Sequence, residues 1–223
     1  METLYTIGHS TYDQKYFIDL LKKYKINCVV DVRSTPYSKY AEQYNMDNIN
    51  YALNKEGIKY LYMGKEFGAR RNDRSLYDPD GKLNFDRTIE SDDFQKGVQR
   101  IKNGLKKGFR ISFMCTEKNP KDCHRCILVG KAFDDMGYDI QNITEDGNTL
   151  SQKEICKQLA DEYVPESDQI SFLVVDGPKS YEDRVKEAYH IREKEIAYSI
   201  GEEYKRNDYI YNWVYTKECR DFF

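Results

Sequence analysis

Residues 3–34, TLYTIGHSTYDQKYFIDLLKKYKINCVVDVRS, contain the pattern that decides the fold. The first five are rich in β-branched and aromatic side chains, which predicts a short buried strand. Residues 13–24 repeat apolar side chains at helical spacing and predict a helix. Residues 28–32 are again apolar and β-branched, which predicts a second strand. A strand, a helix and a strand in this order are typical of a parallel βαβ unit.

The same alternation continues along the chain. Further strands are predicted at 58–63, 109–115 and 138–143, and further helices at 45–56, 91–108, 123–136 and 151–163. The polar segment 64–90 exceeds the usual loop length inside a compact domain, which favours a functional or mobile loop. We therefore expect an α/β protein with a three-layer open sheet, mostly parallel, with right-handed crossovers and helices on both faces.

The chain divides into a predicted core and a C-terminal elaboration. Residues 1–163 are expected to form the α/β core domain, and residues 164–223 an elaboration packed on that core. Within the elaboration, residues 170–175 are predicted to form a strand and residues 181–207 a long charged helix. The aromatic segment 209–215 is strand-like. The sequence assigns no function to this part.

Composition and charge restrict the partners and the compartment. Charged residues make up 33% of the 223 residues, yet the net charge is only −3, so no global basic field indicates nucleic acid. The start of the chain has neither a basic nor an apolar leader region, and no apolar run approaches about 20 residues. We expect a cytoplasmic protein without membrane contact and read its six cysteines as reduced thiols. The oligomeric state and any cofactor stay open.

Reactive side chains follow four of the predicted strands. In open α/β sheets, ligands bind beyond the carboxyl ends of the strands. Taken singly, each residue has a structural reading: His9 as a helix cap, or Asp31 and Arg33 as an ion pair at a strand end. Their convergence on one edge favours a site. The predicted catalytic residues are His9, Asp31, Cys115 and Glu117, and the predicted ligand-binding residues are Ser10, Arg33, Ser34, Arg70, Cys123, His124 and Arg125.

Five short blocks carry a resemblance to a known family. They are TIGHS (6–10), VDVRSTPYS (30–38), GAR (68–70), MCTE (114–117) and PKDCHR (120–125). In order and approximate spacing, they resemble the signature blocks of the domain of unknown function 488 family over about residues 3–145. The segment before Arg70 departs from the repeated glycine pattern of that family, and Cys126 lies outside the pattern. The resemblance implies an α/β domain with a polar, arginine-containing site, but no settled reaction, and it gives weight to His9, Asp31, Arg33, Arg70, Cys115, Glu117, Cys123, His124 and Arg125.

Two sulfur chemistries compete at residues 113–126, FMCTEKNPKDCHRC. Zinc sites usually combine a C-x2-4-C knuckle with a second ligand pair, whereas neighbouring Cys123 and His124 are expected to point in different directions. The spacing therefore predicts no metal site. A thiol redox protein using Cys123 and Cys126 is an alternative, because this C-x-x-C lies at a predicted helix N-terminus, where the helix dipole lowers a thiol pKa.

Anion handling is the third and preferred reading. A helix N-terminus at His124 and Arg125 presents free N–H groups to a phosphate or carboxylate, and Arg33 and Arg70 are positioned to clamp the same anion. Asp31 and Glu117 then serve as general acid or base, or orient the arginines, with His9 as a proton shuttle. The two thiols are walls of the site or its nucleophile.

The leading hypothesis is therefore an enzyme that binds a phosphate-bearing ligand, such as a nucleotide or nucleic-acid end, and catalyses hydrolysis or group transfer. A non-catalytic nucleic-acid or partner-binding module is the alternative from another class. It would use the same arginines together with the tyrosine-rich surface and the 181–207 helix.

Overall fold

The computed structural model describes residues 2–166 and 179–200 of the chain. Within these residues, a six-stranded sheet has the order β3-β2-β4-β1-β5-β6. The strands are β1 (Thr3–Gly8), β2 (Cys28–Asp31), β3 (Lys59–Tyr62), β4 (Ile111–Cys115), β5 (Asp139–Ile143) and β6 (Thr149–Ser151). The first five run parallel, and β6, which the sequence did not predict, pairs antiparallel with β5. The expected open, mostly parallel α/β sheet is confirmed.

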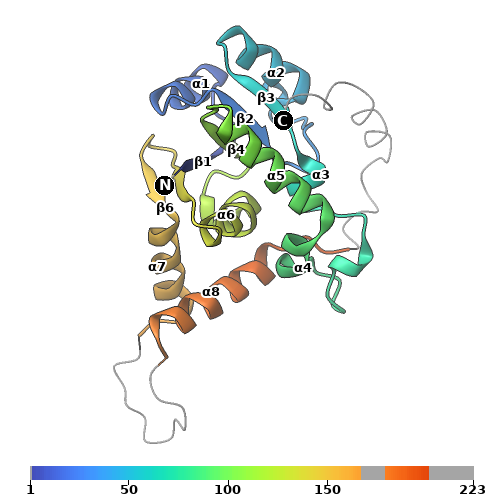
Figure 1. Ribbon diagram of the computed structural model, residues 1–223, viewed down its shortest axis with the longest axis vertical. Coiled ribbons are helices and arrows are strands. Elements are labelled where there is room, and N and C mark those ends of the chain that lie inside the picture. The colour runs from blue at the N-terminus through green and yellow to red at the C-terminus, as the bar shows by residue number, and fades with distance from the viewer. Residues whose placement is uncertain (1, 167–178, 201–223) are drawn as a thin grey trace, which may run out of the picture.

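Helices cover both faces of the sheet (Figure 1). One face carries α1 (Gln14–Lys23) and α2 (Met46–Lys55), and the other carries α5 (Asp92–Lys106), α6 (Lys131–Asp135) and α7 (Gln152–Tyr163). Phe113 on β4 packs in the cluster of α5 and α6, whereas its neighbour Met114 packs in the cluster of α1 and α2. Because successive side chains of a strand point to opposite faces, one strand supplies both cores.

Local signals explain where the helices begin. The carboxylate of Asp13 accepts from the backbone N–H groups of Lys15 and Tyr16 and caps α1. Ser151 and Glu154 form a reciprocal capping box at the start of α7. Such caps satisfy N–H groups that have no partner inside a helix.

The segment 64–90 is more ordered than a polar loop. It contains α3 (Gly64–Phe67), the 3-10 turn η2 (Arg74–Leu76) and α4 (Phe85–Glu90), and an earlier 3-10 turn, η1 (Glu42–Tyr44), precedes α2. Phe67 and Phe85 are buried in the main core. These apolar anchors tie the segment to the sheet, which is why its polar composition was misleading.

The predicted helix 123–136 is divided. A 3-10 turn, η3 (Pro120–Asp122), precedes a π-helical turn, η4 (Arg125–Gly130), and only then does α6 begin. The backbone N–H of Lys131 donates to the carbonyl of Cys126, which is the i to i−5 pattern of a π-helix. The Gln152 side chain donates to the same carbonyl at 3.1 Å. Turns of this kind occur frequently at functional sites.

Helix α8 (Tyr181–Ile196) lies across the core beside α7 and reaches toward α4 (Figure 1). The buried Arg184 side chain donates to the Val164 carbonyl and pairs with Asp161 and Glu166. The helix ends at Ile196, before the predicted end at 207. The predicted strands 170–175 and 209–215 lie outside the described residues, as do residues 201–207. No helix formed by the described residues is long and apolar enough to cross a membrane.

Candidate functional site

Strands β1 and β4 bring their carboxyl ends into close contact. The His9 N–H donates to the Cys115 carbonyl at 2.9 Å, and the Ser10 N–H donates to the Thr116 carbonyl at 2.8 Å. A Cβ atom at Gly8 would lie 1.9 Å from the Glu117 carbonyl oxygen, so only glycine permits this approach. Ser10 adopts a left-handed backbone conformation with φ 47°. The loops after β1 and β4 are therefore fixed against each other.

A buried ionic network occupies the end of β2. The Arg33 guanidinium pairs with the Asp31 carboxylate at 2.6 Å and also donates to the Tyr44 carbonyl at 2.9 Å. The Tyr60 hydroxyl donates to the same carboxylate at 2.6 Å. Asp31 is fully buried and Arg33 is 4% exposed. Both predicted site residues are thus committed to partners inside the protein.

His9 belongs to this network. Its Nδ1–H donates to the Ser10 carbonyl at 2.7 Å, which leaves Nε2 to accept from Arg33 at 3.1 Å. The imidazole stacks on the Tyr44 ring with centroids 4.2 Å apart. Burial, followed by the nearby positive charge of Arg33, lowers the pKa of His9 to about 4. The ring is therefore neutral at pH 7, with both nitrogens engaged.

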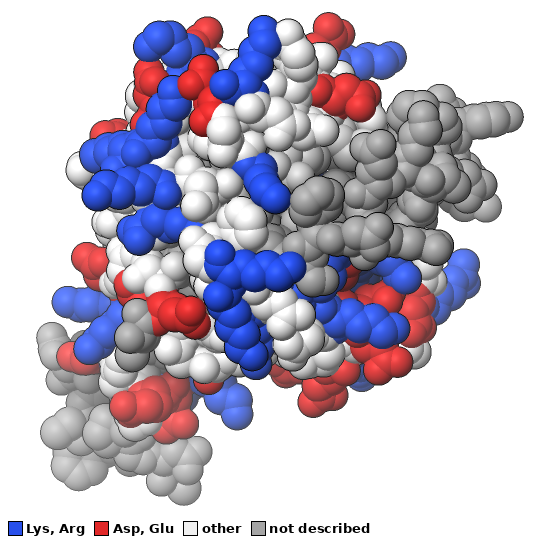
Figure 2. Space-filling model, turned by 45° about the horizontal axis from the view of Figure 1, so that its top comes forward, with Lys and Arg blue, Asp and Glu red and all other residues white. Residues whose placement is uncertain are grey.

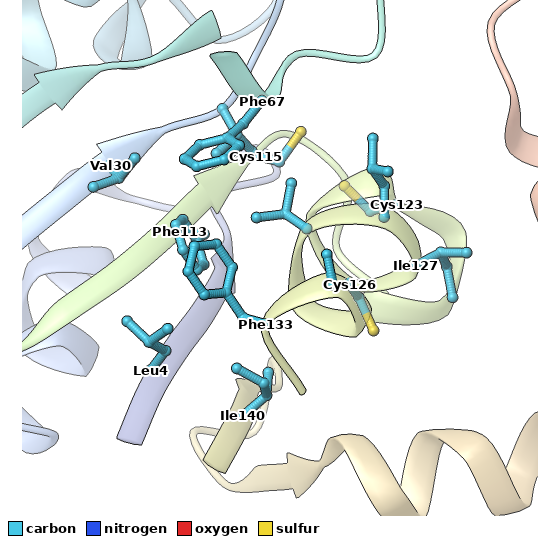
Figure 3. Close-up of a cluster of buried hydrophobic side chains, with 14 of the residues drawn as sticks. Leu4, Val30, Phe67, Phe113, Cys115, Cys123, Cys126, Ile127, Phe133 and Ile140 are labelled. Carbon is cyan, nitrogen blue, oxygen red and sulfur yellow. The ribbon is translucent and has the colours of Figure 1, made fainter. Parts of the chain in front are cut away.

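A second cluster lies at the end of β4. The Glu117 Oε2 atom accepts from the Cys123 thiol at 2.8 Å and from the Cys115 thiol at 3.2 Å. The Nδ1 atom of His124 lies 3.8 Å from the Cys115 Sγ atom. Figure 3 shows the Cys115 and Cys123 sulfurs facing the space between β4 and the helical turn, with the Cys126 sulfur beyond that turn. Two thiols, a carboxylate and an imidazole therefore share one small volume.

Proton affinities differ strongly within this cluster. Burial raises the pKa of Cys115 well above the ordinary thiol value, and neighbouring Cys123 adds to the effect. Burial also opposes ionisation of Cys123, but the Cys115 hydrogen bond and the Arg125 charge outweigh it and hold the pKa of Cys123 well below that value. For His124, burial lowers the pKa, yet the Cys123 hydrogen bond and charge leave it raised. Burial and Cys123 raise the pKa of Glu117. Cys123 thus loses its proton more readily than Cys115, and in that state the Glu117–Cys123 hydrogen bond runs from a protonated Glu117 to the sulfur.

Arg125 lies inside the protein beneath the loop after β4. Its guanidinium donates to the carbonyls of Glu117 and Lys118 at 2.6 and 3.2 Å. The side chain is fully buried, and its Nε atom has no hydrogen-bond partner within residues 2–166 and 179–200. Among the described residues, no carboxylate forms an ion pair with it. Arg125 therefore holds the loop rather than reaching toward solvent.

Cys126 is separated from this cluster. Its sulfur lies 3.6 Å from the Gln152 Oε1 atom, and burial raises its pKa to about 12. All five cysteines among the described residues are free thiols. A bond between Cys123 and Cys126 requires both side chains to turn away from their present partners.

A surface hollow of about 370 Å³ lies beyond the end of β3. Arg70 lines it, with its backbone N–H held by the Ser34 hydroxyl at 2.8 Å and its guanidinium 4.8 Å from the centre of the Tyr198 ring. Lys65 and Lys96 contribute further positive charge, although Asp93 lies 3.3 Å from Lys65. Figure 2 shows that Lys and Arg side chains lie among Asp and Glu on one face of the molecule, without a continuous field of one sign.

The predicted residues thus form two connected groups and a neighbouring hollow. His9, Asp31 and Arg33 form the buried network, whereas Cys115, Glu117, Cys123 and His124 form the thiol cluster. The His124 Nε2–H donates to the Val32 carbonyl at 3.0 Å and joins the two groups. Ser34 then connects this loop to Arg70. Ser10 takes part through its backbone, whose N–H fixes the β1 loop and whose carbonyl accepts from His9.

Several partners were not recognised in the sequence. Tyr60 reaches Asp31 because β2 and β3 pair in a register that no local pattern reveals. Tyr44 lies in a segment for which the sequence predicts neither a helix nor a strand. Lys65 and Lys96 line the hollow because α5 packs beside α3. Their only sequence signal was positive charge, which is common on protein surfaces.

The fold and the cluster define an α/β protein with a polar, thiol-containing site at the carboxyl edge of a parallel sheet. Residues 13–131, more than half of the chain, match the family described as domain of unknown function DUF488, and the chain belongs to this family. The matched range includes the thiol cluster and the hollow but starts after His9. No curated protein and no solved structure matches the chain.

Proposed function

We propose that this protein is an enzyme that binds a phosphate-bearing ligand, such as a nucleotide or nucleic-acid end, and catalyses hydrolysis or group transfer. The observation that carries the proposal is that the thiol cluster at the end of β4 and a hollow of mixed charge at the end of β3 lie on the same edge of the sheet, on either side of β2. The adjacent β2 loop links them through Val32 and Ser34. Binding and chemistry would then use one edge of the sheet.

The hollow supplies the binding half of the proposal. Its volume of about 370 Å³ falls within the usual range for small-molecule sites. Lys65, Arg70 and Lys96 place cationic side chains around it, beside the carboxylates of Asp73, Asp92 and Asp93. Arg70 is the principal candidate for holding a phosphate, because its guanidinium can donate two parallel hydrogen bonds to an oxyanion. This differs from the expectation for Arg33, whose charge is already paired with Asp31.

The cluster supplies the reactive groups. A Cys123 thiolate is a nucleophile that requires no further activation, and a protonated Glu117 or His124 beside it is a proton donor for a leaving group. In this scheme, Asp31 and His9 do not contact the substrate. They fix the β2 loop, whose Val32 carbonyl orients the His124 ring. Free thiols of this kind suit a reducing compartment such as the cytoplasm.

Binding and turnover are tested separately. The full chain is titrated by calorimetry with inorganic phosphate, AMP, ADP and a 5′-phosphorylated oligonucleotide, and release of phosphate or nucleoside is followed by chromatography. Arg70→Gln should weaken binding of the ligand that the wild type prefers by at least about tenfold, the order expected for a lost charged hydrogen bond. Arg74→Gln is the matched control, since Arg74 is exposed and does not line the hollow.

The second variant is Glu117→Gln, which should reduce turnover while leaving binding in the hollow unchanged. Equal binding by wild type and Arg70→Gln contradicts the binding half. Strong, salt-dependent oligonucleotide binding without any turnover would favour the non-catalytic nucleic-acid-binding module instead.

A further inference from the structure

Three soft ligand groups converge at the end of β4 in a geometry suited to a metal ion. The Sγ atoms of Cys115 and Cys123 and the Nδ1 atom of His124 all lie within 4.8 Å of one another. In tetrahedral zinc sites, with Zn–S near 2.3 Å and Zn–N near 2.0–2.1 Å, neighbouring ligand atoms are roughly 3.5–4 Å apart. The observed Cys115–His124 separation of 3.8 Å already meets that spacing. Only a small contraction is needed to close the site around an ion.

The imidazole is oriented as a ligand. Its Nε2–H donates to the Val32 carbonyl at 3.0 Å, so the lone pair of the neutral ring lies on Nδ1, toward the thiols. Metal-binding histidines nearly always donate the other ring N–H to a carbonyl or carboxylate in this way. The acceptor, Val32, directly follows the adjacent strand β2, so the position of this strand in the sheet orients the ring.

The backbone explains why two sequential residues face the same ion. Cys123 has extended dihedral angles, φ −137° and ψ 136°, whereas His124 is helical, with φ −59° and ψ −22°. Side chains alternate only along a continuous strand. The change from extended to helical backbone removes the alternation and turns both side chains toward Cys115. The spacing argument against a metal site assumed directions that this turn does not have.

A divalent metal ion bound by two thiolates would leave the buried charges around the cluster balanced. Arg125 is a fully buried cation whose guanidinium donates to the carbonyls of Glu117 and Lys118, and its backbone N–H donates to the Cys123 Sγ atom at 3.5 Å. Buried charges are normally paired. Two thiolates, a neutral imidazole, the Glu117 carboxylate and a divalent cation sum to one negative charge, which Arg125 neutralises. The Glu117 carboxylate lies beside the site, 2.8 and 3.2 Å from the two sulfurs.

We propose that Cys115, Cys123 and His124 bind one zinc ion, with the fourth position left to water or substrate beside Glu117. Thiolate and imidazole ligands in tetrahedral arrangement favour zinc over magnesium, calcium or manganese. The site goes beyond the proposed phosphate chemistry, and ligand binding in the hollow does not depend on it, but a zinc-bound Cys123 is no longer a free nucleophile, so zinc would replace that part of the scheme. Three protein ligands with an open fourth position are typical of catalytic zinc sites, and the exposed residue Glu117 lies beside that position.

The test measures metal directly on the full chain. Reduced protein is stripped of metal and titrated with zinc against a chromophoric chelator, without any phosphate-bearing ligand. One zinc per chain is expected. Cobalt, which takes the same geometry, should give tetrahedral ligand-field bands and thiolate-to-metal charge-transfer bands. Cys123→Ser and His124→Gln should weaken zinc binding by more than about 100-fold, because loss of a second-shell partner alone costs about 10- to 100-fold.

Matched variants outside the cluster serve as controls. Cys156→Ser and His190→Gln change the same residue types at positions away from the cluster and should bind zinc like the wild type. Circular dichroism checks that each variant is folded, and the wild-type cobalt spectrum identifies thiolate ligands even if a cluster variant does not fold. Absence of stoichiometric zinc, a cobalt spectrum without thiolate bands, or equal losses in the control variants would overturn the proposal. None of these results would decide the proposal of phosphate binding, which the calorimetric titration of Arg70→Gln tests separately.

Discussion

The imidazole of His124 donates from Nε2 to the backbone oxygen of Val32 at 3.0 Å, and this bond joins the turn after β4 to the end of β2. The two strands are neighbours in the sheet, with Asp31 opposite Met114. The buried Asp31–Arg33 pair fixes the loop that carries the acceptor. The orientation of a reactive side chain on one loop is thus controlled by an ion pair on another.

Folding stability should fall in mild acid because of His9. Its pKa is lowered from 6.5 to about 4 in the folded protein, so between these values the unfolded chain binds a proton that the folded chain does not. Stability is then present above pH 6.5 and decreases as the pH falls toward 4, by up to about 3 kcal/mol. Urea unfolding at pH 7.5, 6 and 5 measures this loss. His9→Gln should flatten the profile, whereas a variant of exposed His190 should retain it; identical slopes for His9→Gln and wild type would contradict the assignment.

Removing the Arg33 charge should strongly destabilise the fold. Arg33→Met leaves the fully buried Asp31 carboxylate without its cation, and breaking one side of a buried pair typically costs about 3–5 kcal/mol. Arg74→Gln, at an exposed position, should change stability by less than about 0.5 kcal/mol. Guanidinium denaturation compares the two variants. A small loss in Arg33→Met would mean that the pair contributes little to the fold.

Alanine at position 8 should displace the loop after β4. The added Cβ would overlap the Glu117 carbonyl oxygen, and relief of such overpacking costs about 1–3 kcal/mol. Gly57→Ala is the comparison, because it meets no atom within 4 Å but has φ +71°, so only backbone strain of roughly 1–2 kcal/mol applies. Thermal unfolding gives the stability loss, and zinc affinity reports the position of Cys115. Only Gly8→Ala should reduce that affinity.

Loss of the Tyr189 hydroxyl should weaken the attachment of α8. The Gln152 Nε2 group donates to this hydroxyl at 2.8 Å inside the core. Tyr189→Phe leaves the buried donor with fewer partners, which costs about 1–2 kcal/mol. Tyr181→Phe, on the exposed first turn of α8, should be nearly neutral. Hydrogen exchange of α8 amides should rise in Tyr189→Phe alone, and unchanged protection would show that this bond does not hold the helix.

The sheet was predictable because its signals are local. Residues 3–34 show strand and helix periodicities directly, and caps such as Asp13 and Ser151 mark where helices begin. The edge that gathers the polar groups followed from the parallel topology. Strand β6 is only three residues long, too short for a recognisable period.

The positions of the candidate residues along the sheet edge could be predicted, whereas the partners of their side chains could not. Asp31 and His9 were expected to act on a ligand, yet their burial and partners depend on Tyr60 and Tyr44, which are distant in sequence. The directions of Cys123 and His124 depend on backbone angles at two positions, which residue spacing does not encode. The hollow arises where α3 and α5 pack together.

The π-helical turn η4 also changes the direction in which the Arg125 side chain points relative to that of Phe133. A wide turn contains one residue more than an α-helical turn, and each α-helical residue rotates the chain by about 100°. Deleting a single residue from this turn would therefore leave Phe133 in the core and rotate Arg125 away from the carbonyls of Glu117 and Lys118. Because of the extra residue, one continuous helical segment directs Phe133 toward the apolar interior and Arg125 toward the loop that carries the thiol cluster.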